Sequence, residues 1–510
     1  MLFYPRTDSP ARPDEPKGER NEIPPRTRAH PLSAPPLLLL PACSESAENQ
    51  DDPGTKTGAP NGSDASVPSP EIEAEDEDAK PEYYNMLPAE DFDGWKLTIA
   101  NDGLSSEYFS GFCVDELTGD VFNDGLYNRR VAVQDKYNVV IEETNNGAAN
   151  GIRQSVTSGS GDVGFGYVLT ASCMGLISAN YVLPITDLPT VDMSKPYWDK
   201  GAQETLTFFD KMFFGYCDIG WDHYESMAVL FYNGFLLVDS GLSDSPYDLY
   251  MEGKWTLDRM YDMMNAVVQD ADGDGKMTSG KDIFGWSGRE FEYLPSLYSS
   301  NLRLVRYDET ADTYVMDVTQ DAVMAVGDKL NAIINDPNLS VPGRNDETRN
   351  MFKDGKCLFY SRLLGDFRNL RDKEDDYGII CYPSLEENTD GMVYVQQPYA
   401  ILVPSDCPDT ARIGTMLEAL AAYTYDNVLD DYIQKTVIGK GARDQQSAEL
   451  LEKFITIRAF DLCYAFNVFA PIDAYGLGVK GGNYASAQQR QSKVFAKSVA
   501  KSVEALKGKG

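Results

Sequence analysis

Strand-like and helix-like segments alternate along more than 400 residues of this 510-residue chain, from about residue 93 to the C-terminus. Trp95-Lys-Leu-Thr-Ile-Ala100 alternates apolar and polar side chains as a strand does, residues 123–137 have a helical pattern, and Val139-Val-Ile-Glu142 is a second strand-like run. A strand, a crossover helix and a strand in this order form a parallel pair. The pattern predicts an α/β fold, and the alternating region is too long for one sheet with one core.

Two later helices are marked by apolar stripes. Thr256 is the predicted N-cap of the first, whose stripe consists of Leu257, Met260, Tyr261, Met264 and Val268. The second stripe ends at Asp336-Pro337 and consists of Val323, Val326, Leu330, Ile333 and Ile334. Further strands are expected at residues 228–232, 356–360, 377–381 and 399–403.

Acidic side chains dominate the charge, because 80 Asp and Glu against 45 Lys and Arg leave a net charge of −35. Such a surface repels phosphate groups and anionic lipid headgroups, so neither a nucleic-acid partner nor docking on a membrane through basic patches is expected. The chain has no run of about 18 apolar residues, so no transmembrane helix is predicted. Its two histidines, His30 and His223, make a multi-histidine metal site or a catalytic relay with a spare base unexpected.

The first 43 residues have no apolar periodicity and are rich in proline and charge until Leu40-Pro-Ala-Cys43, which looks like a bacterial lipobox. Residues 1–43 are therefore predicted to be a signal and lipobox segment, with Cys43 as the lipidated N-terminus of the exported protein. Residues 44–92 are predicted to be a disordered acidic tether, because residues 44–80 hold eleven acids against two lysines. An ordinary disordered N-terminal arm is the alternative. The seven later cysteines are widely spaced and lack a CxxC pair, so we expect free thiols.

Several segments, read in order, resemble the extracellular solute-binding proteins of family 1, the maltose-binding type of bacterial ABC importers. They are Asn123-Asp-Gly-Leu-Tyr-Asn-Arg-Arg130 with residues 135–139, then residues 188–199, 230–233, 253–258 and 351–359, and finally Asp375-Asp-Tyr-Gly-Ile-Ile-Cys-Tyr-Pro-Ser384. Family members usually have a basic residue where Ser384 stands. The resemblance implies a two-lobed periplasmic-binding-protein-like fold with a hinge and an interlobe ligand cleft. By analogy, lobe one is placed at residues 93–205 plus 345–400, and lobe two at residues 206–344 plus 401–510.

Aromatic, acidic and amide side chains at strand ends and expected crossings are the candidate ligand-binding residues. Sugar rings stack on aromatic side chains, while carboxylates, amides and arginines bind the hydroxyl groups. The candidates are Trp221, Asp222, Tyr224, Trp286, Arg289, Glu290, Arg362, Gln396 and Tyr399. Core packing is the alternative role of each tryptophan.

The sharpest local motif is Asp270-Ala-Asp-Gly-Asp-Gly-Lys276, which has the spacing of a calcium-binding loop. The predicted ligands of a structural Ca²⁺ are the carboxylates of Asp270, Asp272 and Asp274, the carbonyl of Lys276, and Asp282. The twelfth position of the loop holds Lys281 instead of an acid, so Asp282 could reach the ion only through a one-residue bulge. The alternative is an ordinary Asp- and Gly-rich turn.

These observations predict a monomeric receptor, lipid-anchored on the extracellular face of the cell membrane, that performs no catalysis. It is expected to capture a carbohydrate, an oligosaccharide in particular, and to deliver it to an ABC permease. Two alternatives stay open: a secreted glycoside hydrolase that uses two carboxylates, and a non-catalytic adhesin or structural lipoprotein.

Overall fold

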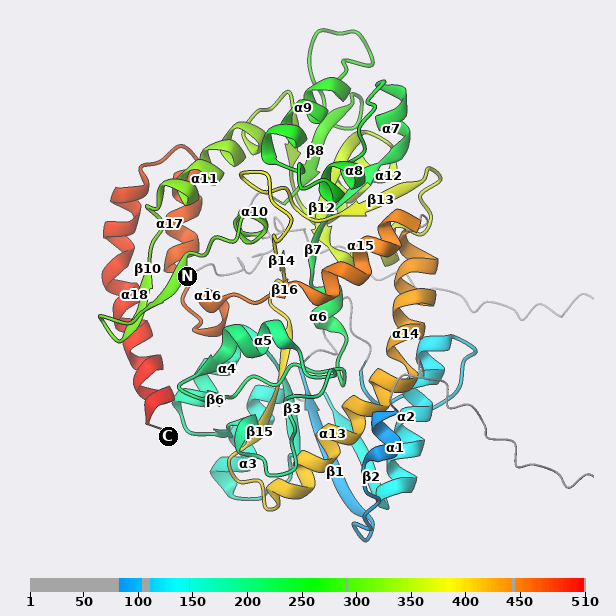
Figure 1. The fold of residues 1–510 in the computed structure, drawn as a ribbon, viewed down its shortest axis with the longest axis vertical. Helices are drawn as coiled ribbons and strands as arrows, with labels where there is room; N and C mark the ends of the chain where they lie inside the picture. Colours follow the sequence, from blue (N-terminus) through cyan, green and yellow to red (C-terminus); the bar gives the residue numbers. More distant parts are fainter. Residues whose placement is uncertain (1–81, 103–110, 146, 290–291, 443–444, 509–510) are drawn as a thin grey trace, which may run out of the picture. The chain divides into compact units, whose positions relative to one another are not determined.

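The computed structural model describes residues 82–102, 111–145, 147–289, 292–442 and 445–508, all of which belong to one compact unit, Pro81–Gly510. The predicted signal and lipobox segment, with Cys43, and most of the predicted tether lie outside the described residues. The described part is an α/β fold built on two five-stranded sheets, which have no described strand in common (Figure 1).

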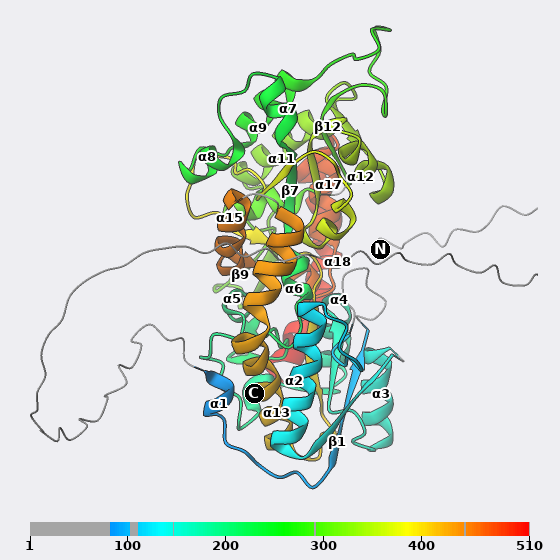
Figure 2. The same ribbon diagram turned by 90° about the vertical axis from the view of Figure 1, so that its right-hand side faces the viewer.

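The first sheet, which defines lobe one, has the strand order β2-β1-β3-β15-β4. Its strands are β1 (Trp95–Asn101), β2 (Val139–Thr144), β3 (Phe165–Leu169), β4 (Val182–Leu183) and β15 (Tyr399–Pro404). β1 pairs in parallel with β2, which confirms the prediction from the strand, helix and strand at residues 95–142. Figure 2 shows α2 (Val121–Tyr137) and α13 (Thr410–Asn427) on one side of β1, and α3 (Ala148–Ser158) on the other.

The second sheet, which defines lobe two, has the strand order β11-β8-β12-β7-β13. Its strands are β7 (Ala228–Asn233), β8 (Phe284–Gly288), β11 (Ser340–Pro342), β12 (Cys357–Leu363) and β13 (Tyr377–Ile380). β12 is parallel to β8, whereas both β12 and β13 are antiparallel to β7. The helices α9 (Leu257–Val267), α11 (Asp321–Ile334) and α12 (Asn345–Lys353) pack on this sheet.

The sheet order corrects the predicted lobe boundaries. Residues 345–400 were assigned to lobe one, yet β12 and β13 of this segment pair with β7 of lobe two. Residues 401–510 were assigned to lobe two, yet β15 pairs with β3 of lobe one. The physical reason is that strand pairing joins segments far apart in the chain, and nothing in the local sequence of a strand specifies its partner.

The remaining elements connect or cover the two sheets. The helices are α1 (Tyr83–Met86), α4 (Thr170–Ser178), η2 (Ile185–Asp187), α5 (Lys200–Leu206), α6 (Asp222–Glu225), α7 (Gly234–Asp239), α8 (Pro246–Met251), α10 (Leu294–Ser299), η3 (Leu364–Leu370), α14 (Leu429–Asp431), the π-helix η4 (Tyr432–Ala442), α15 (Gln445–Thr456), α16 (Leu462–Ala465), α17 (Ala470–Val479) and α18 (Tyr484–Lys507). The short strands are β5 (Thr207–Phe208), β6 (Lys211–Met212), β9 (Val305–Asp308), β10 (Thr313–Met316), β14 (Val393–Tyr394) and β16 (Arg458–Ala459). Among the helices of the described residues, none combines the length and apolar composition that crossing a membrane requires.

The two predicted helices form as their sequence patterns indicate. The Thr256 side chain accepts a hydrogen bond from the amide of Arg259 and caps α9. The stripe of α11 is buried in full, whereas Tyr261 of the α9 stripe is exposed. The seven cysteines of the described residues are free thiols, as predicted.

Residues 82–92 are ordered, so the predicted disordered tether ends earlier than residue 92. The amide of Tyr84 donates to Asp426 Oδ2 of α13 at 2.7 Å, and Lys136 Nζ of α2 donates to the Tyr84 carbonyl at 2.7 Å. The ring of Tyr84 packs edge-on against Tyr423, with centroids 5.0 Å apart. The sequence prediction missed this segment because its aromatic pair follows a long acidic run without a repeating apolar pattern.

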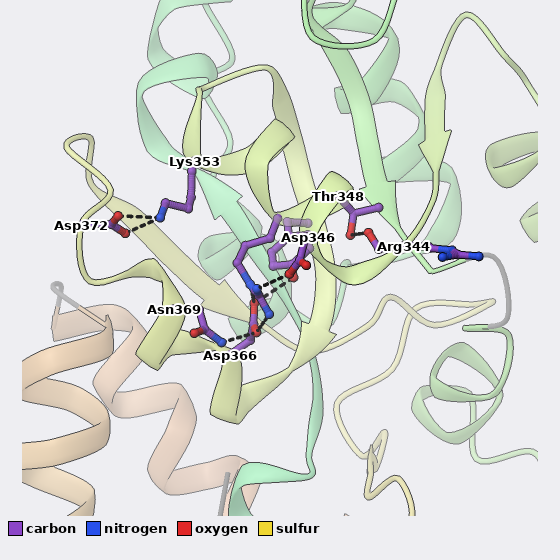
Figure 3. A network of polar contacts seen from close by, with 9 residues as sticks. Arg344, Asp346, Thr348, Lys353, Asp366, Asn369 and Asp372 are labelled. Carbon is purple, nitrogen blue, oxygen red and sulfur yellow. Dashed lines mark hydrogen bonds and ion pairs between the residues drawn. The ribbon is translucent and has the colours of Figure 1, made fainter. Parts of the chain in front are cut away.

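A buried ion-pair network ties α12 to β12 and η3 within lobe two (Figure 3). Asp366 is fully buried, and its carboxylate accepts hydrogen bonds from Arg349 Nε at 3.0 Å and Nη2 at 2.6 Å. The hydroxyl of Tyr360 at 2.8 Å and the amide of Asn369 at 3.0 Å also donate to it. The charged hydrogen bonds hold the pKa of Asp366 below its ordinary value against the opposing effect of burial.

Candidate ligand site at the junction of the lobes

Three segments that connect the lobes run side by side and form what we call the hinge ladder, residues 226–227, 393–396 and 457–459. β14 and β16 pair in parallel, and Met227 bridges to Val395. The amide of Gln396 donates to the Ser226 carbonyl at 2.9 Å, and that of Val395 to the Ala459 carbonyl at 2.9 Å. Figure 1 shows β14 and β16 between the strands of the two sheets. The ladder lies where the resemblance implies a hinge, and Gln396 belongs to one of its segments. A ligand role of Gln396 stays a prediction.

One edge of each sheet, formed by strand ends, lies next to this ladder. In lobe two, Leu363 pairs with Ala228 and Ile380 with Leu230, so the ends of β12 and β13 lie beside the start of β7, next to the ladder. In lobe one, Tyr399 pairs with Leu169, so the start of β15 lies beside the end of β3. Ligands of open α/β sheets bind at the carboxyl ends of parallel strands, so these two edges are the candidate site.

The lobe-one edge consists of Phe112, Tyr167, Trp221, Asp222 and Tyr399, of which the sequence predicted the last three. The rings of Tyr167 and Tyr399 stack with centroids 5.4 Å apart, and Phe112 lies edge-on to Tyr167 at 4.8 Å. Trp221 and Asp222 are buried, and Tyr399 is half-buried. The structure thus brings three predicted residues together with two aromatic residues that the sequence did not single out.

Asp222 Oδ2 accepts a hydrogen bond from the amide of Tyr399 at 2.7 Å. This bond joins the segment that leads into Ser226 of the hinge ladder to the start of β15. Burial, reinforced by the nearby acid Glu225, raises the pKa of Asp222 to about 8. At neutral pH the group is therefore mostly protonated unless a cation or a set of donors approaches it.

Tyr224 belongs to a buried polar network beside the ladder rather than to the lobe-one edge. Its hydroxyl donates to Asp218 Oδ1 at 2.5 Å, and the guanidinium of Arg458 lies 4.1 Å from the centroid of its ring. Arg458 Nη2 is 2.6 Å from Asp199 Oδ2. Burial raises the pKa of Asp218 to about 7. Sequence analysis missed Arg458, because a single arginine after a helix carries no local signal of its buried partner.

The lobe-two edge consists of Arg289, Glu292, Arg362 and Tyr382. The hydroxyl of Tyr382 donates to Glu292 Oε2 at 2.7 Å. Burial raises the pKa of Glu292, and Tyr382, Arg362 and Arg289 act in the opposite direction. Arg289 and Arg362 were predicted, whereas Glu292 and Tyr382 were missed. The predicted Glu290 lies outside the described residues.

Trp286 is buried within β8, where it pairs with Phe359 of β12. A Cβ added to Gly288 would lie 2.4 Å from the Trp286 ring and 1.8 Å from Ser361 Oγ. The side chain therefore packs inside lobe two, two residues before the end of β8. This position supports the packing role of Trp286, while a ligand role stays a prediction.

Two pockets on the surface of lobe two have volumes of about 430 and 340 Å³. The first includes Met277, Phe284 and Pro342, and the second includes Leu237 and Val238. Neither contains a predicted ligand residue. We favour the lobe junction as the site, because buried carboxylates and arginines converge there with aromatic rings.

The predicted calcium loop brings its first three carboxylates together. Oxygen atoms of Asp270, Asp272 and Asp274 lie within 4.8 Å of one another. Lys281 Nζ lies 3.0 Å from Asp272 Oδ2, which offsets part of the repulsion. Asp282 is not in this group, since it is buried and accepts hydrogen bonds from the amides of Ala271 and Thr278 at 2.9 and 2.7 Å. The carboxylate set suits a hard cation with a preference for oxygen.

We expect Ca²⁺ to raise the melting temperature of the protein, and Mg²⁺ to raise it less. A cation bound only by the native state stabilises it by about 2.7 kcal/mol at a concentration of 100 Kd. Asp272→Ala should abolish the calcium response, whereas Asp262→Ala, at an exposed position of α9, should keep it. A thermal melt that responds to neither Ca²⁺ nor a chelator would leave an ordinary Asp-rich turn.

No protein-family model matches this sequence, and no curated protein sequence matches it. Solved structures do match the fold. The sugar-binding protein MalE from Xanthomonas citri aligns with a TM-score of 0.54 at 12% identity, covering 80% of this chain and 98% of its own. The fold is that of the extracellular solute-binding proteins.

Further matches have the same fold. The galacto-N-biose-/lacto-N-biose I-binding protein of the ABC transporter from Bifidobacterium longum aligns with a TM-score of 0.52 at 11% identity, covering 82% of this chain and 98% of its own. A family 1 extracellular solute-binding protein from Bifidobacterium longum subsp. infantis aligns with a TM-score of 0.50 at 12% identity, covering 79% and 99%. The two-lobed solute-binding fold predicted from the resemblance is therefore confirmed.

Proposed function

We propose that the protein is an extracellular receptor that binds a carbohydrate between its two lobes and performs no chemistry on it. The observation that carries the proposal is that each lobe has an edge of polar and aromatic side chains next to the hinge ladder. The edge of lobe one has aromatic rings and a carboxylate, and that of lobe two has arginines and a glutamate. The fold supports it, since the solute-binding proteins named above include sugar-binding ones.

The two edges offer what a sugar requires. Tyr167, Tyr399 and Trp221 supply aromatic faces for the C–H faces of a sugar ring, and Asp222, Glu292 and Arg362 supply acceptors and donors for hydroxyl groups. Lobes that rotate about the ladder would enclose the ligand, and burial of these polar groups against water would strengthen each hydrogen bond.

A thermal-shift screen of the full chain against neutral and amino oligosaccharides, peptides and polyamines tests this proposal. A cleft ligand stabilises the native state by mass action, so a carbohydrate should raise the melting temperature. Tyr399→Ala should reduce that shift, while Tyr261→Ala, at an exposed tyrosine of α9, should not. Shortened products in the sugar mixture would indicate a glycoside hydrolase, and stabilisation by no ligand would favour an adhesin.

The proposal includes a lipid anchor at Cys43, a position on the extracellular face of the cell membrane, a monomeric state and an ABC permease as partner. Its supports are the lipobox-like Leu40-Pro-Ala-Cys43 and the likeness to the binding protein of an ABC transporter. In a bacterium that processes lipoproteins, the wild type should fractionate with membranes, and Cys43→Ser should be released or left unprocessed. Identical fractionation of the two would refute the anchor.

A further inference from the structure

Asp222 is a buried carboxyl group with an electrostatic environment unlike that of its neighbours. It is 2% exposed, its Oδ2 accepts one hydrogen bond from Tyr399, and its Oδ1 has no hydrogen-bond partner among the described residues. Burial and a second acid, Glu225, raise its pKa, whereas backbone amides, among them those of Tyr399 and His223, act in the opposite direction. By contrast, Glu225 is paired with Arg368 and accepts from Tyr432, and Asp199 is paired with Arg458.

The arginines near Asp222 have other partners among the described residues. Arg458 pairs with Asp199 and Arg368 with Glu225. Arg129 donates to the carbonyls of Ile219 and Phe112 at 2.9 and 3.3 Å. His223 is buried, and burial together with Arg458 lowers its pKa well below the ordinary value, so the imidazole is neutral. Asp102, which follows β1 and whose amide donates to the Tyr167 carbonyl at 3.0 Å, is half-buried, and burial raises its pKa. Among the described residues no cation forms an ion pair with Asp222, although the guanidinium of Arg129 lies 6.0 Å from the centroid of the Phe112 ring.

Aromatic rings surround this edge in a connected set. Tyr399 supplies the amide bound to Asp222 and stacks on Tyr167 at 5.4 Å. Phe112 contacts both Tyr167 at 4.8 Å and Trp221 at 6.3 Å, centroid to centroid. Aromatic faces beside a carboxylate that lacks a counterion are the chemistry that recognises an ammonium group.

We propose that the ligand carries an ammonium group, with Asp222 as its counterion and the rings of the lobe-one edge packed around it. This inference rests on the proposed function and narrows it to a carbohydrate with a free amino group, such as an oligosaccharide of glucosamine units. Asp222 is 2% exposed, so the proposal requires the lobes to open about the hinge ladder, four residues away at Ser226, before such a ligand can reach it.

Calorimetric titration of the full chain with glucosamine oligomers and with the same oligomers N-acetylated tests the charge directly. The free-amino form should bind tighter by on the order of a hundredfold, as a charged hydrogen bond and a cation–π contact together provide. Asp222→Asn keeps an oxygen acceptor for the Tyr399 amide and removes the charge, so it should abolish the preference. Asp239→Asn, at an exposed position of α7, is the matched control and should retain it.

Proton release provides a second readout that needs no variant. Because the carboxyl group holds its proton at about pH 6 in the free protein, an ammonium ligand should displace roughly one proton on binding, and the acetylated ligand none. Titrations in two buffers of different ionisation enthalpy measure this number. Equal affinity for the two oligomers, or no proton release with the amino form, would overturn the inference and leave the carbohydrate receptor intact. Failure of both oligomers and of neutral oligosaccharides to bind would overturn the inference and the receptor function together.

Discussion

Replacing Arg458 by methionine should lower the free energy of unfolding by about 3–5 kcal/mol, because it leaves a buried carboxylate without its cation. The side chains of Arg458 and Asp199 are 8% and 2% exposed, and their charged atoms are 2.6 Å apart. Asp199 also caps α5 by accepting from the amide of Ala202 at 2.8 Å, so the uncompensated charge cannot turn away to solvent without loss of that cap. Urea unfolding followed by circular dichroism measures the change.

Lys254→Met is the control for this variant. Lys254 pairs with Glu252 at 2.8 Å, but the two side chains are 52% and 58% exposed. Exposed pairs contribute at most about 1 kcal/mol, so this variant should unfold nearly as the wild type does. Equal destabilisation by the two substitutions would show that Arg458 does not compensate a buried charge.

Arg349→Met should have an effect of similar size on lobe two, about 3–5 kcal/mol, for the same reason. Asp366 would lose the two bonds from Arg349 and keep Tyr360 and Asn369 as donors (Figure 3). The substitution should also raise the pKa of Asp366, so that this carboxylate is protonated more readily in acid. The difference in the free energy of unfolding between the wild type and the variant should therefore be smaller in acid than near neutral pH.

The neighbouring pair of Lys353 and Asp372 provides the control for Arg349→Met. Its atoms are 2.5 Å apart, and Asp372 is 72% exposed. Lys353→Met should therefore cost less than about 1 kcal/mol. A loss for Arg349→Met that is no larger, or that is independent of pH, would contradict the role assigned to the Asp366 network.

Local sequence patterns predicted the elements but not their partners. The run at residues 228–232 was identified as a strand, and it forms most of β7, because a short apolar run with β-branched and aromatic side chains favours a buried strand locally. Its pairing with β12, more than 100 residues later, depends on the whole chain. For this reason the resemblance predicted the two-lobed fold correctly, while the lobe boundaries drawn by analogy misplaced β12, β13 and β15.

The candidate site was predicted in part for a similar reason. Trp221, Asp222 and Tyr399 stand at strand ends or crossings, which sequence patterns locate. Arg458 and Glu292 join the site through contacts with residues more than 80 positions away, such as Asp199 and Tyr382. No local sequence pattern indicates such contacts, so they can be identified only in the folded structure.

Small-angle X-ray scattering of residues 82–510, with and without a saturating carbohydrate ligand, tests the central claim most directly. If the two lobes close about the hinge ladder on a ligand held between their edges, the radius of gyration should decrease on binding. Tyr399→Ala, which removes one ring of the lobe-one edge, should require more ligand to reach the same decrease. A radius of gyration that stays constant at saturation would contradict a hinged receptor.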